Sequence, residues 1–410
     1  MSENFITDIY VENSINIKDL SISLAKDHCQ HLIITGKNGS GKTSLLLEIN
    51  KFLSQLESPI SQTVVAAFDR IENIENQLKD SNLTQTEKDN LNRLLGLQKI
   101  QIKNSGGTRL FFSNNIRELH STIKKGEFLL AFFDSKRHTD LSIPKGINKI
   151  ELKKKYNLKE KANTNFIQYI VNLKADRSFA RDDNEIDVVQ EIDNWFIRLE
   201  ERLKLIFDVD SLELRFNRKS YNFDIFINDS QSFNFNTLSD GYSAIISIVT
   251  ELILRMEAHN RKSYDLEGIV IIDEIETHLH VDLQKKILPF LTDFFPKIQF
   301  IVTTHSPFVL SSLSNTTICD LETRIVTTDL SGYSYDALLE SYFKTDKYSE
   351  EIKSKIIEFD KLTSLKEKTA EQLEQIRNLR NYFAHTPKYL ATELLVKLQQ
   401  IELNELNDKK

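Results

Sequence analysis

The sequence predicts an α/β fold in which a parallel β-sheet carries a functional site at the carboxyl ends of its strands. Three stretches of the 410-residue chain carry this prediction. Residues 33–50, "IITGKNGSGKTSLLLEIN", form an apolar run, a glycine-rich turn and a leucine-rich helical run. The apolar runs 269–272 and 298–302 are each followed by polar residues. Runs of branched apolar residues are typical of strands buried on both faces, which occur in parallel sheets.

Composition and charge exclude several classes of protein. Forty per cent apolar residues can build a sizeable core, and a formal net charge of −7 argues against general coating of nucleic acid. Cys29 and Cys319 lack metal-ligand spacing and predict no disulfide framework. The first ten residues lack a signal peptide's apolar segment, and no apolar run approaches the roughly 20 residues of a membrane helix. We therefore expect a cytoplasmic protein with no membrane contact.

The first part of the chain is predicted to hold core strands and one helical insertion. Short strands are expected over residues 5–35, a helix to about residue 56, and strands again at "TRLFF" and "EFLLAFF". Thr84 and Glu87 have the spacing of a capping box. We predict a helical hairpin over 62–105, either an arm that reaches a partner or a packed insertion, from apolar positions at helical spacing: Phe68, Ile71, Ile74, Leu78, Leu91, Leu94, Leu95 and Ile100.

The second part begins with a lysine-rich run at 144–161. This run is either a solvated face or a contact to DNA or RNA phosphates through Lys153, Lys154 and Lys155. An amphipathic helix is predicted over 185–207, followed by the strands "SLELRF" and "YNFDIFI". The strand that ends at His305 is expected to close the core. The helical tail then presents an apolar face, buried on its own core or against another subunit: Leu373, Ile376, Leu379, Leu390, Leu394, Leu398 and Ile401.

These elements predict six segments. They are a core lobe with the glycine-rich loop (1–61), a helical hairpin insertion (62–106), core strands (107–150), a helical subdomain (151–207), a core segment with the remaining motifs (208–330) and a helical C-terminal region (331–410).

The glycine-rich turn matches the pattern G-x-x-x-x-G-K-[ST] and is predicted to bind a nucleoside triphosphate. Glycines let successive backbone N–H groups face phosphates, and the following helix adds its positive N-terminal end. Lys42 is expected to reach the β- and γ-phosphates, and Thr43 to hold Mg²⁺. The preceding strand and following helix are the context that this motif needs. The candidate nucleotide-binding residues are Gly36, Asn38, Gly39, Ser40, Gly41, Lys42, Thr43 and Ser44.

Polar residues that follow the two later strands are the candidate catalytic groups. Asp273 is predicted to share Mg²⁺ with Thr43, and Glu274 to polarise the attacking water. An acidic pair at a helix N-terminus is the alternative, and the phosphate loop disfavours it. His305 ends the stretch "VTTH" and is placed to sense the γ-phosphate, although a lone histidine is more often structural.

A second anion-binding turn is predicted before a long helix, in "FNTLSDGYSAIISIVTELILR". A serine- and glycine-containing turn at a helix N-terminus favours anions, and this one lacks the lysine of a phosphate loop. Each chain already has one anion-binding site for its own nucleotide, the phosphate loop. The second anion-binding turn therefore predicts a homo-oligomer, at least a dimer, in which the turn of one copy covers the nucleotide of another copy. The residues of this turn are Leu238, Ser239, Asp240 and Gly241.

The motifs "GKNGSGKT", "LSDGY", "IIDEIETHLH" and "TTHSP" occur in the order used by ABC-type ATPases and resemble their P-loop, signature, Walker B and switch histidine. The resemblance covers roughly 5–60, 108–150 and 205–325. The sequences of these motifs are similar to those of soluble SMC, RecF and OLD ATPases of the AAA family. More narrowly, they resemble the motifs of PtuA-like ATPases from the anti-phage Septu and retron systems.

Departures from the family pattern are few. Asp240 and Tyr242 stand where glycine and glutamine are commoner in the signature, and Val281 stands where relatives often have proline. Asp134 or Arg137 is the candidate for the Q-loop region. Tyr10 is the candidate for stacking on the adenine.

The resemblance implies an ABC-ATPase head that uses ATP and Mg²⁺ and pairs head to tail, with ATP between Lys42 of one copy and Ser239 of the other. It also implies a defence complex with a separate nuclease effector, of HNH or Toprim type. This chain offers Glu322 and Asp329 to a Toprim site but no D-x-D pair, so no nuclease is expected here. The alternative is a RecF- or Rad50-like DNA-binding ATPase of repair or chromosome maintenance. The short predicted arm weighs against a Rad50-like protein, whereas a RecF-like clamp stays open, with the lysine run as its best support.

Overall fold

The computed structural model describes most of the chain, in two units that are treated separately. The units are Met1–Tyr333 and Ser334–Lys410. The described residues are 3–14, 16–58, 64–80, 83–104, 107–137, 141–228, 231–258, 264–338, 350–365, 368–384 and 399.

A six-stranded sheet forms the centre of the first unit, with strand order β12-β11-β3-β10-β9-β5. The five strands from β11 to β5 are parallel, and β12 is antiparallel to β11. Every residue of β3, β9, β10 and β11 is buried, as expected of strands covered on both faces. The strands are β3 (His31–Thr35), β5 (Leu129–Phe133), β9 (Gly268–Ile272), β10 (Ile298–Thr303), β11 (Thr316–Asp320) and β12 (Ile325–Thr328).

The expectation that the strand before His305 closes the core is wrong. The sheet continues through β11, which pairs in parallel with β3, the strand before the phosphate loop. The sequence of β11, "TTICD", has three polar residues in five and so lacks the apolar run that identifies a buried strand. Thr317 is nevertheless buried, and its hydroxyl donates to the side chain of Gln30 at 2.7 Å.

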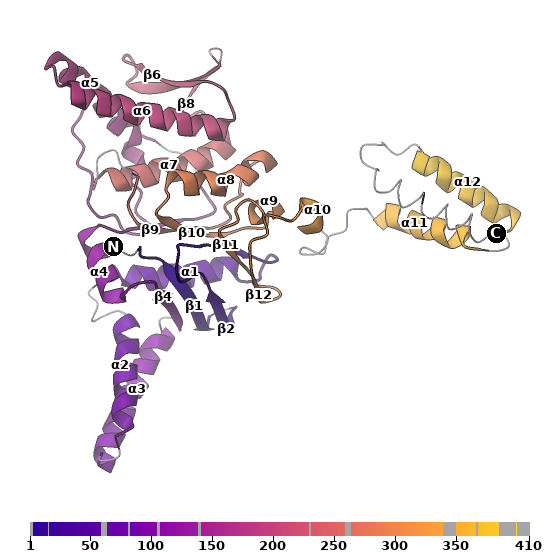
Figure 1. The fold of residues 1–410 in the computed structure, drawn as a ribbon, viewed down its shortest axis with the longest axis horizontal. Coiled ribbons are helices and arrows are strands. Elements are labelled where there is room, and N and C mark those ends of the chain that lie inside the picture. The colour runs from indigo at the N-terminus through magenta and orange to yellow at the C-terminus, as the bar shows by residue number, and fades with distance from the viewer. Residues whose placement is uncertain are drawn as a thin grey trace. The chain divides into compact units, whose positions relative to one another are not determined.

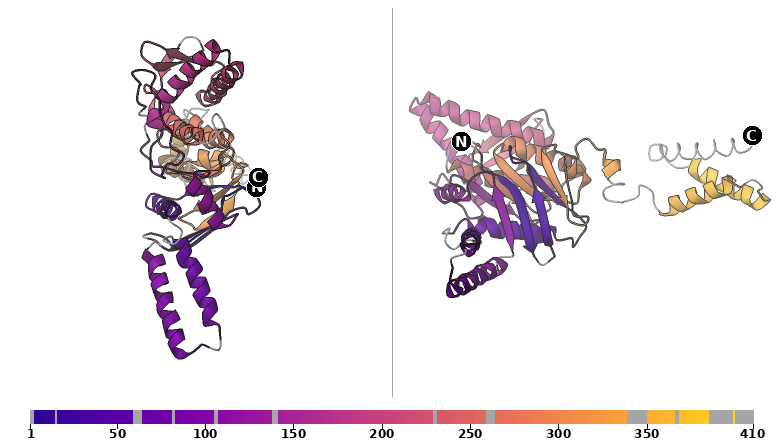
Figure 2. Two further views of the ribbon diagram at one scale, coloured as in Figure 1. Left: turned by 90° about the vertical axis from the view of Figure 1, so that its left-hand side faces the viewer. Right: turned by 60° about the horizontal axis from the view of Figure 1, so that its bottom comes forward.

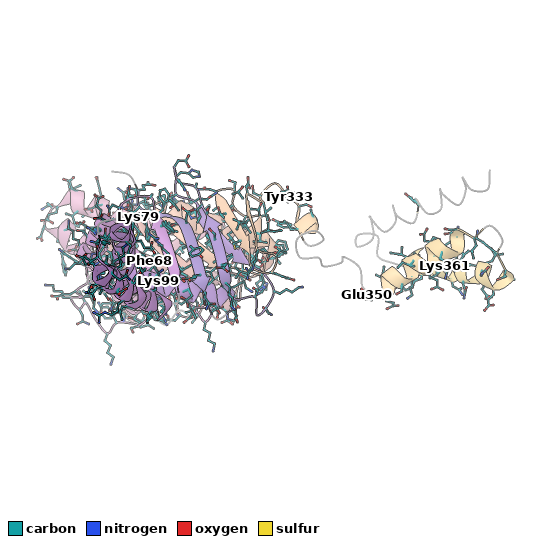
Figure 3. The ribbon with its side chains drawn as sticks, turned by 90° about the horizontal axis from the view of Figure 1, so that it is seen from below. Phe68, Lys79, Lys99, Tyr333, Glu350 and Lys361 are labelled. Carbon is teal, nitrogen blue, oxygen red and sulfur yellow. The ribbon has the colours of Figure 1, made fainter. Side chains whose placement is uncertain are left out.

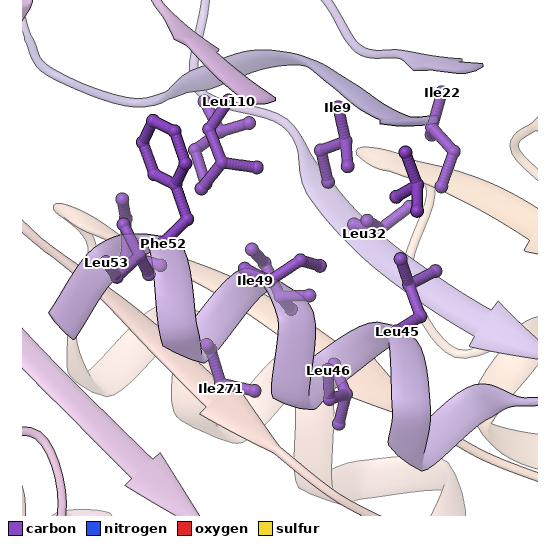
Figure 4. Packing of buried hydrophobic residues seen from close by; sticks show 14 of the residues in the cluster. Ile9, Ile22, Leu32, Leu45, Leu46, Ile49, Phe52, Leu53, Leu110 and Ile271 are labelled. Atoms are coloured by element: carbon purple, nitrogen blue, oxygen red, sulfur yellow. The ribbon is translucent and has the colours of Figure 1, made fainter. Parts of the chain in front are cut away.

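Helix α1 (Lys42–Gln55) is clamped between the central sheet and a three-stranded antiparallel sheet. That second sheet has the order β2-β1-β4 and comprises Lys18–Ser23, Ile6–Asn13 and Thr108–Phe112. Figure 4 shows how apolar side chains of α1 meet residues of both sheets. This packing fixes the position of the start of α1, which directly follows the phosphate loop. The buried apolar residues of α1 are Leu45, Leu46, Ile49, Phe52 and Leu53.

Helices cover the opposite face of the central sheet (Figure 1). They are α7 (Asp240–Glu257), which is buried along nearly its whole length, and α8 (Val281–Phe294). Beyond them lie α5 (Phe166–Asp182), the predicted amphipathic helix α6 (Ile186–Phe207) and the antiparallel sheet β6-β7-β8 (Leu212–Asn217, Asn222–Ile227 and Gln231–Asn234). The shorter elements are α4 (Ile116–Lys125), the 3-10 turn Asn163–Asn165 and α9 (Pro307–Leu310).

The predicted helical hairpin consists of α2 (Val64–Leu78) and α3 (Gln85–Asn104), which project together from the body of the unit (Figure 2). The predicted capping box is confirmed, since Glu87 Oε2 accepts from the backbone N–H and the hydroxyl of Thr84 at 2.9 and 2.7 Å. Figure 3 labels Phe68, Lys79 and Lys99 on this hairpin. At 1.5 Å per residue, its arms span about 22 and 30 Å.

The second unit has a small core of its own. Helices α11 (Glu350–Thr363) and α12 (Ala370–Ala384) follow the short α10 (Tyr335–Ala337). Ile376 and Leu379 pack within this core, whereas Leu373 is 54% exposed. The other four apolar positions predicted for the tail lie outside the described residues. Among the described residues of both units, no helix combines the length and apolarity needed to cross a membrane.

Candidate functional site

The phosphate loop joins β3 to α1 and adopts a backbone that needs glycine. Gly36, Gly39 and Gly41 have φ angles of 136°, 82° and 102°, which L side chains rarely adopt. A Cβ atom on Gly36 would also lie 2.8 Å from the hydroxyl oxygen of Ser40. That hydroxyl is buried and has no hydrogen-bond partner among the described residues. The loop therefore has the shape and the spare donor expected of a phosphate cradle.

Lys42 folds its ammonium group back into this loop. Its Nζ donates to the carbonyl oxygens of Gly36 at 2.9 Å and Lys37 at 3.1 Å, and the residue is only 6% exposed. Burial lowers the pKa of Lys42, while the carboxylate of Glu274 opposes that shift. The ammonium thus lies inside the loop, at the position where phosphate oxygens would replace the two carbonyl groups.

Thr43 and Asp273 meet across 230 residues of sequence, as predicted for a shared Mg²⁺ site. The Thr43 hydroxyl donates to Asp273 Oδ2 at 3.0 Å and Oδ1 at 3.3 Å. Thr303, at the end of β10, donates its hydroxyl to Asp273 Oδ1 at 2.6 Å. Hydroxyl and carboxylate oxygens are ligands that Mg²⁺ prefers, so the residues present fit this ion.

Glu274 sits in a strained turn directly after β9. Its φ angle is 46°, the left-handed region that non-glycine residues rarely adopt. Its backbone N–H donates to the hydroxyl of Thr303 at 2.7 Å. The neighbouring strand β10 therefore holds this backbone. The Glu274 side chain is half-buried, and its Oε2 accepts the hydroxyl of Thr277 at 3.3 Å.

Arg137 forms hydrogen bonds with the backbone of the turn that contains Glu274. Its guanidinium donates to the carbonyl oxygens of Asp134 at 2.8 Å, Asp273 at 2.6 Å and Glu274 at 2.8 Å. The residue is 4% exposed, and its Nε has no partner among the described residues. The sequence made Arg137 a candidate for the Q-loop region but gave no sign of this contact, because the carbonyl groups of Asp273 and Glu274 lie more than 130 residues away.

His305 lies close to the acidic turn. Its backbone N–H donates to Glu276 Oε1 at 2.5 Å, and its Nε2 is buried without a partner among the described residues. Burial lowers the pKa of His305, and the positive charge of Lys42 lowers it further. The imidazole is therefore neutral near pH 7. Glu276 was missed as a site residue, although its place two residues after Glu274 was a visible signal.

The signature turn begins α7, with Ser239 as the N-cap residue. The Ser239 side chain is exposed and makes no capping hydrogen bond. Gly241 is buried, and a Cβ atom there would lie 2.9 Å from the carbonyl oxygen of His278. Tyr242 stacks on Phe207 with ring centroids 4.3 Å apart, which accounts for an aromatic residue at this position. Asp240 is exposed and Leu238 is half-buried.

The turn after β11 contacts the phosphate loop, which the sequence did not predict. Glu322 forms an ion pair with Lys37 at 2.6 Å, and its backbone nitrogen would lie 3.3 Å from a Cβ atom on Gly36. This ion pair raises the pKa of Lys37. Glu322, considered above for a nuclease site, is thus a neighbour of the nucleotide loop.

The turn between β1 and β2 also reaches the phosphate loop. Asn16 and Ile17 would each lie within 3.4 Å of a Cβ atom on Gly41. Tyr10 lies further back in β1 and is 39% exposed. Its role in adenine stacking stays a prediction.

Together, the parallel sheet, the glycine-dependent loop and the acidic strand end define an α/β fold with the phosphate loop of a nucleotide-binding protein, as predicted. A family model described as "AAA domain, putative AbiEii toxin, Type IV TA system" matches residues 166–311.

The chain is also similar to curated proteins. It is 34% identical over 144 residues to the Septu protein PtuA of Bacillus thuringiensis, covering 33% of this chain and 34% of that protein. It is 42% identical over 84 residues to the Retron Ec83 probable ATPase of Escherichia coli, covering 20% of this chain and 16% of that protein. The chain thus spans about a third or less of the length of these relatives. These matches confirm the predicted resemblance to PtuA-like ATPases.

A solved structure of an SMC head bound to the C-terminal winged-helix domain of ScpA aligns with 77% of this chain and 94% of its own chain. The sequence identity is 11% and the TM-score is 0.38.

Proposed function

We propose that this chain binds and hydrolyses ATP as the ABC-type ATPase subunit of a cytoplasmic anti-phage defence complex. The observation that carries the proposal is the hydrogen bond between Thr43, at the start of α1, and Asp273, at the end of β9. It joins the phosphate loop to the acidic strand end, which is the arrangement that phosphoryl transfer from a nucleotide requires.

In the proposed reaction, the oxygen of a water molecule bonds to the γ-phosphorus of ATP. The bond from that phosphorus to the bridging oxygen breaks, which leaves ADP and phosphate. Glu274 orients the water and accepts its proton, and Lys42 balances charge on the β- and γ-phosphates. Mg²⁺, when held by Thr43 and Asp273, supplies further positive charge to these phosphates. The neutral imidazole of His305 is suited to contact the γ-phosphate or the water.

Pairing of two copies around ATP is part of the proposal. The N-terminus of α7 carries the partial positive charge of its helix, which favours an anion. Ser239 at this end is exposed, and its hydroxyl is not used as a cap. Such a hydroxyl is suited to contact the γ-phosphate bound to Lys42 of a second copy.

Regulation of a separate nuclease completes the proposed role. Support comes from the similarity to Septu and retron ATPases and from the second unit, which has a core of its own. The alternative, direct DNA binding through Lys153, Lys154 and Lys155, stays a prediction. The ion pair that Lys153 forms with Glu160 in the same segment does not favour this alternative.

The test uses two substitutions in the full chain. Glu274→Gln should slow ATP turnover by about a hundredfold or more while nucleotide binding is kept, because only the proton acceptor is lost. It should also trap paired copies with ATP, measured as mass by light scattering. Lys42→Ala should weaken nucleotide binding itself. Normal turnover in the Glu274→Gln protein would show that another group polarises the water.

A further inference from the structure

A cavity of about 450 Å³ lies beside the phosphate loop rather than within it. Thr43 and Asp273 form one end of the cavity, which continues past Leu47 of α1 and Phe132 of β5. None of residues 36–42 lines it. Because the phosphates of a nucleotide bind at the N–H groups of that loop, ATP would approach only the end of the cavity at Thr43.

Positive charge gathers around this cavity. Lys136, Lys159 and Lys161 line it, are exposed, and form no ion pair with the described residues. Arg137 lines it as well, is 4% exposed, and leaves its Nε without a partner in the described part of the chain. A buried guanidinium that binds only carbonyl groups keeps its full charge. The cavity therefore offers four cations that no carboxylate neutralises by direct contact.

Two of the four carboxylates that line the cavity form ion pairs with cations. Glu251 forms a buried ion pair with Arg255 at 2.7 Å, and Glu160 pairs with Lys153. Asp273 accepts the hydrogen bonds of the Mg²⁺ site described above. Those donors are neutral hydroxyl groups, so Asp273 and the exposed Asp134 are two carboxylates without an ion pair among the described residues, against four such cations. The balance of unpaired charge in the cavity is therefore positive.

The segment that contains Lys159 and Lys161 is held in place by two residues of α7. Glu251 accepts hydrogen bonds from the backbone N–H groups of Ala162 and Asn163 at 2.8 and 2.9 Å. Arg255 donates to the carbonyl oxygens of Asn157 and Glu160. These contacts flank Lys159 and Lys161 on both sides, so their backbone is fixed before any ligand binds. Pre-organisation of this kind lowers the cost of binding.

We propose that this cavity binds a phosphate-bearing small molecule of nucleotide size, distinct from the ATP in the phosphate loop. The lysines suit the phosphate, and Leu47 and Phe132 supply apolar wall for a flat ring, with Lys159 Nζ 5.8 Å from the centroid of the Phe132 ring. A cavity of about 450 Å³ fits one such molecule better than a continuous strand of nucleic acid. Because Arg137 lines the cavity and also binds the Glu274 turn, the ligand would lie against a residue that holds the catalytic carboxylate.

The test measures binding of guanosine monophosphate by calorimetry to the full chain carrying Lys42→Ala, in which the phosphate loop no longer competes. In this protein, Lys136→Gln, Lys159→Gln and Lys161→Gln together should weaken binding at least about tenfold, since three charge-assisted contacts are lost. The matched control carries Lys124→Gln, Lys145→Gln and Lys149→Gln, three exposed lysines outside the cavity. The control should bind within about twofold of the parent, because only distant charge changes.

Three results would overturn the proposal. One is no binding of guanosine monophosphate to the Lys42→Ala protein, and another is equal weakening by both triple substitutions. The third is loss of binding to a single-stranded DNA oligonucleotide with no effect on the mononucleotide, which would make the lysines a nucleic-acid contact. None of these measurements depends on ATP turnover, so failure of the proposed ATPase function would be seen separately.

Discussion

Single residues of this site are held by backbone contacts as much as by side-chain chemistry. Glu274 has a left-handed backbone, which costs on the order of 1 kcal/mol or more, and this strain persists only where neighbours enforce it. The hydroxyl of Thr303 and the guanidinium of Arg137 are the neighbours that do so. Arg137 thus acts through Glu274, as a positioning residue.

Replacement of Arg137 by methionine should lower kcat for ATP while changing KM little. The carbonyl groups of Asp134, Asp273 and Glu274 would lose their donor, at about 1–3 kcal/mol for each buried unsatisfied group. Arg137→Lys should restore part of kcat, since an ammonium can still donate to these oxygens.

Steady-state kinetics and thermal unfolding of these variants check the prediction. Arg181→Met, at an exposed site, is the control. A rise in KM with unchanged kcat would instead place Arg137 in ground-state nucleotide binding.

At the scale of elements, the contact between β3 and β10 contains a buried histidine. His31 on β3 is 7% exposed and accepts the backbone N–H of Phe300 through Nδ1 at 3.1 Å. Burial lowers the pKa of His31 to about 4. The strand before the phosphate loop therefore depends on a neutral imidazole.

The free energy of unfolding should fall as pH drops from about 6.5 towards 4. In this window the unfolded chain binds a proton at His31 and the folded chain does not, so acid favours unfolding, by up to about 3 kcal/mol in total. Above pH 6.5 this histidine should have no effect. Denaturant unfolding at about pH 7 and about pH 5 measures the difference.

His31→Gln should remove most of this pH dependence, because a glutamine oxygen can accept the same N–H and does not titrate. His280→Gln, at an exposed position, should leave it intact. An unchanged pH dependence in the His31→Gln protein would assign the effect to other groups.

At the scale of the whole molecule, two units have separate cores. The second unit buries six apolar side chains among its own helices: Ile356, Phe359, Leu362, Ile376, Leu379 and Phe383. The nucleotide loop, the acidic turn and the signature turn all belong to the first unit. The six-segment division of the chain stays a prediction.

Removal of residues 334–410 should leave ATP binding and the melting temperature of the first unit nearly unchanged, because no part of the described site is lost. It should abolish co-purification with the nuclease that the proposed function requires. Replacement of the exposed Leu373 by glutamate is the milder variant, since it leaves the core of the second unit intact. Aggregation of the shortened chain would show that the second unit completes the first core.

The sequence alone determined the features that short stretches encode. Glycine spacing and the apolar strand before it specify the phosphate loop, and apolar runs specify β3, β9 and β10. Helical periodicity specifies α6 and the α2–α3 hairpin, and the Thr84 capping box fixes the start of α3.

Only the tertiary structure decided what depends on distant groups. Strand β11 is buried although its residues are mostly polar, because its hydroxyl groups find partners on neighbouring segments. The local sequence made Arg137 a candidate for the Q-loop region but did not reveal its contacts, since its partners are carbonyl groups that every residue possesses. The pairs Glu276–His305 and Glu322–Lys37 likewise join positions that only the folded sheet brings together. Local pattern determines which elements form, and the packing of those elements determines which polar groups meet.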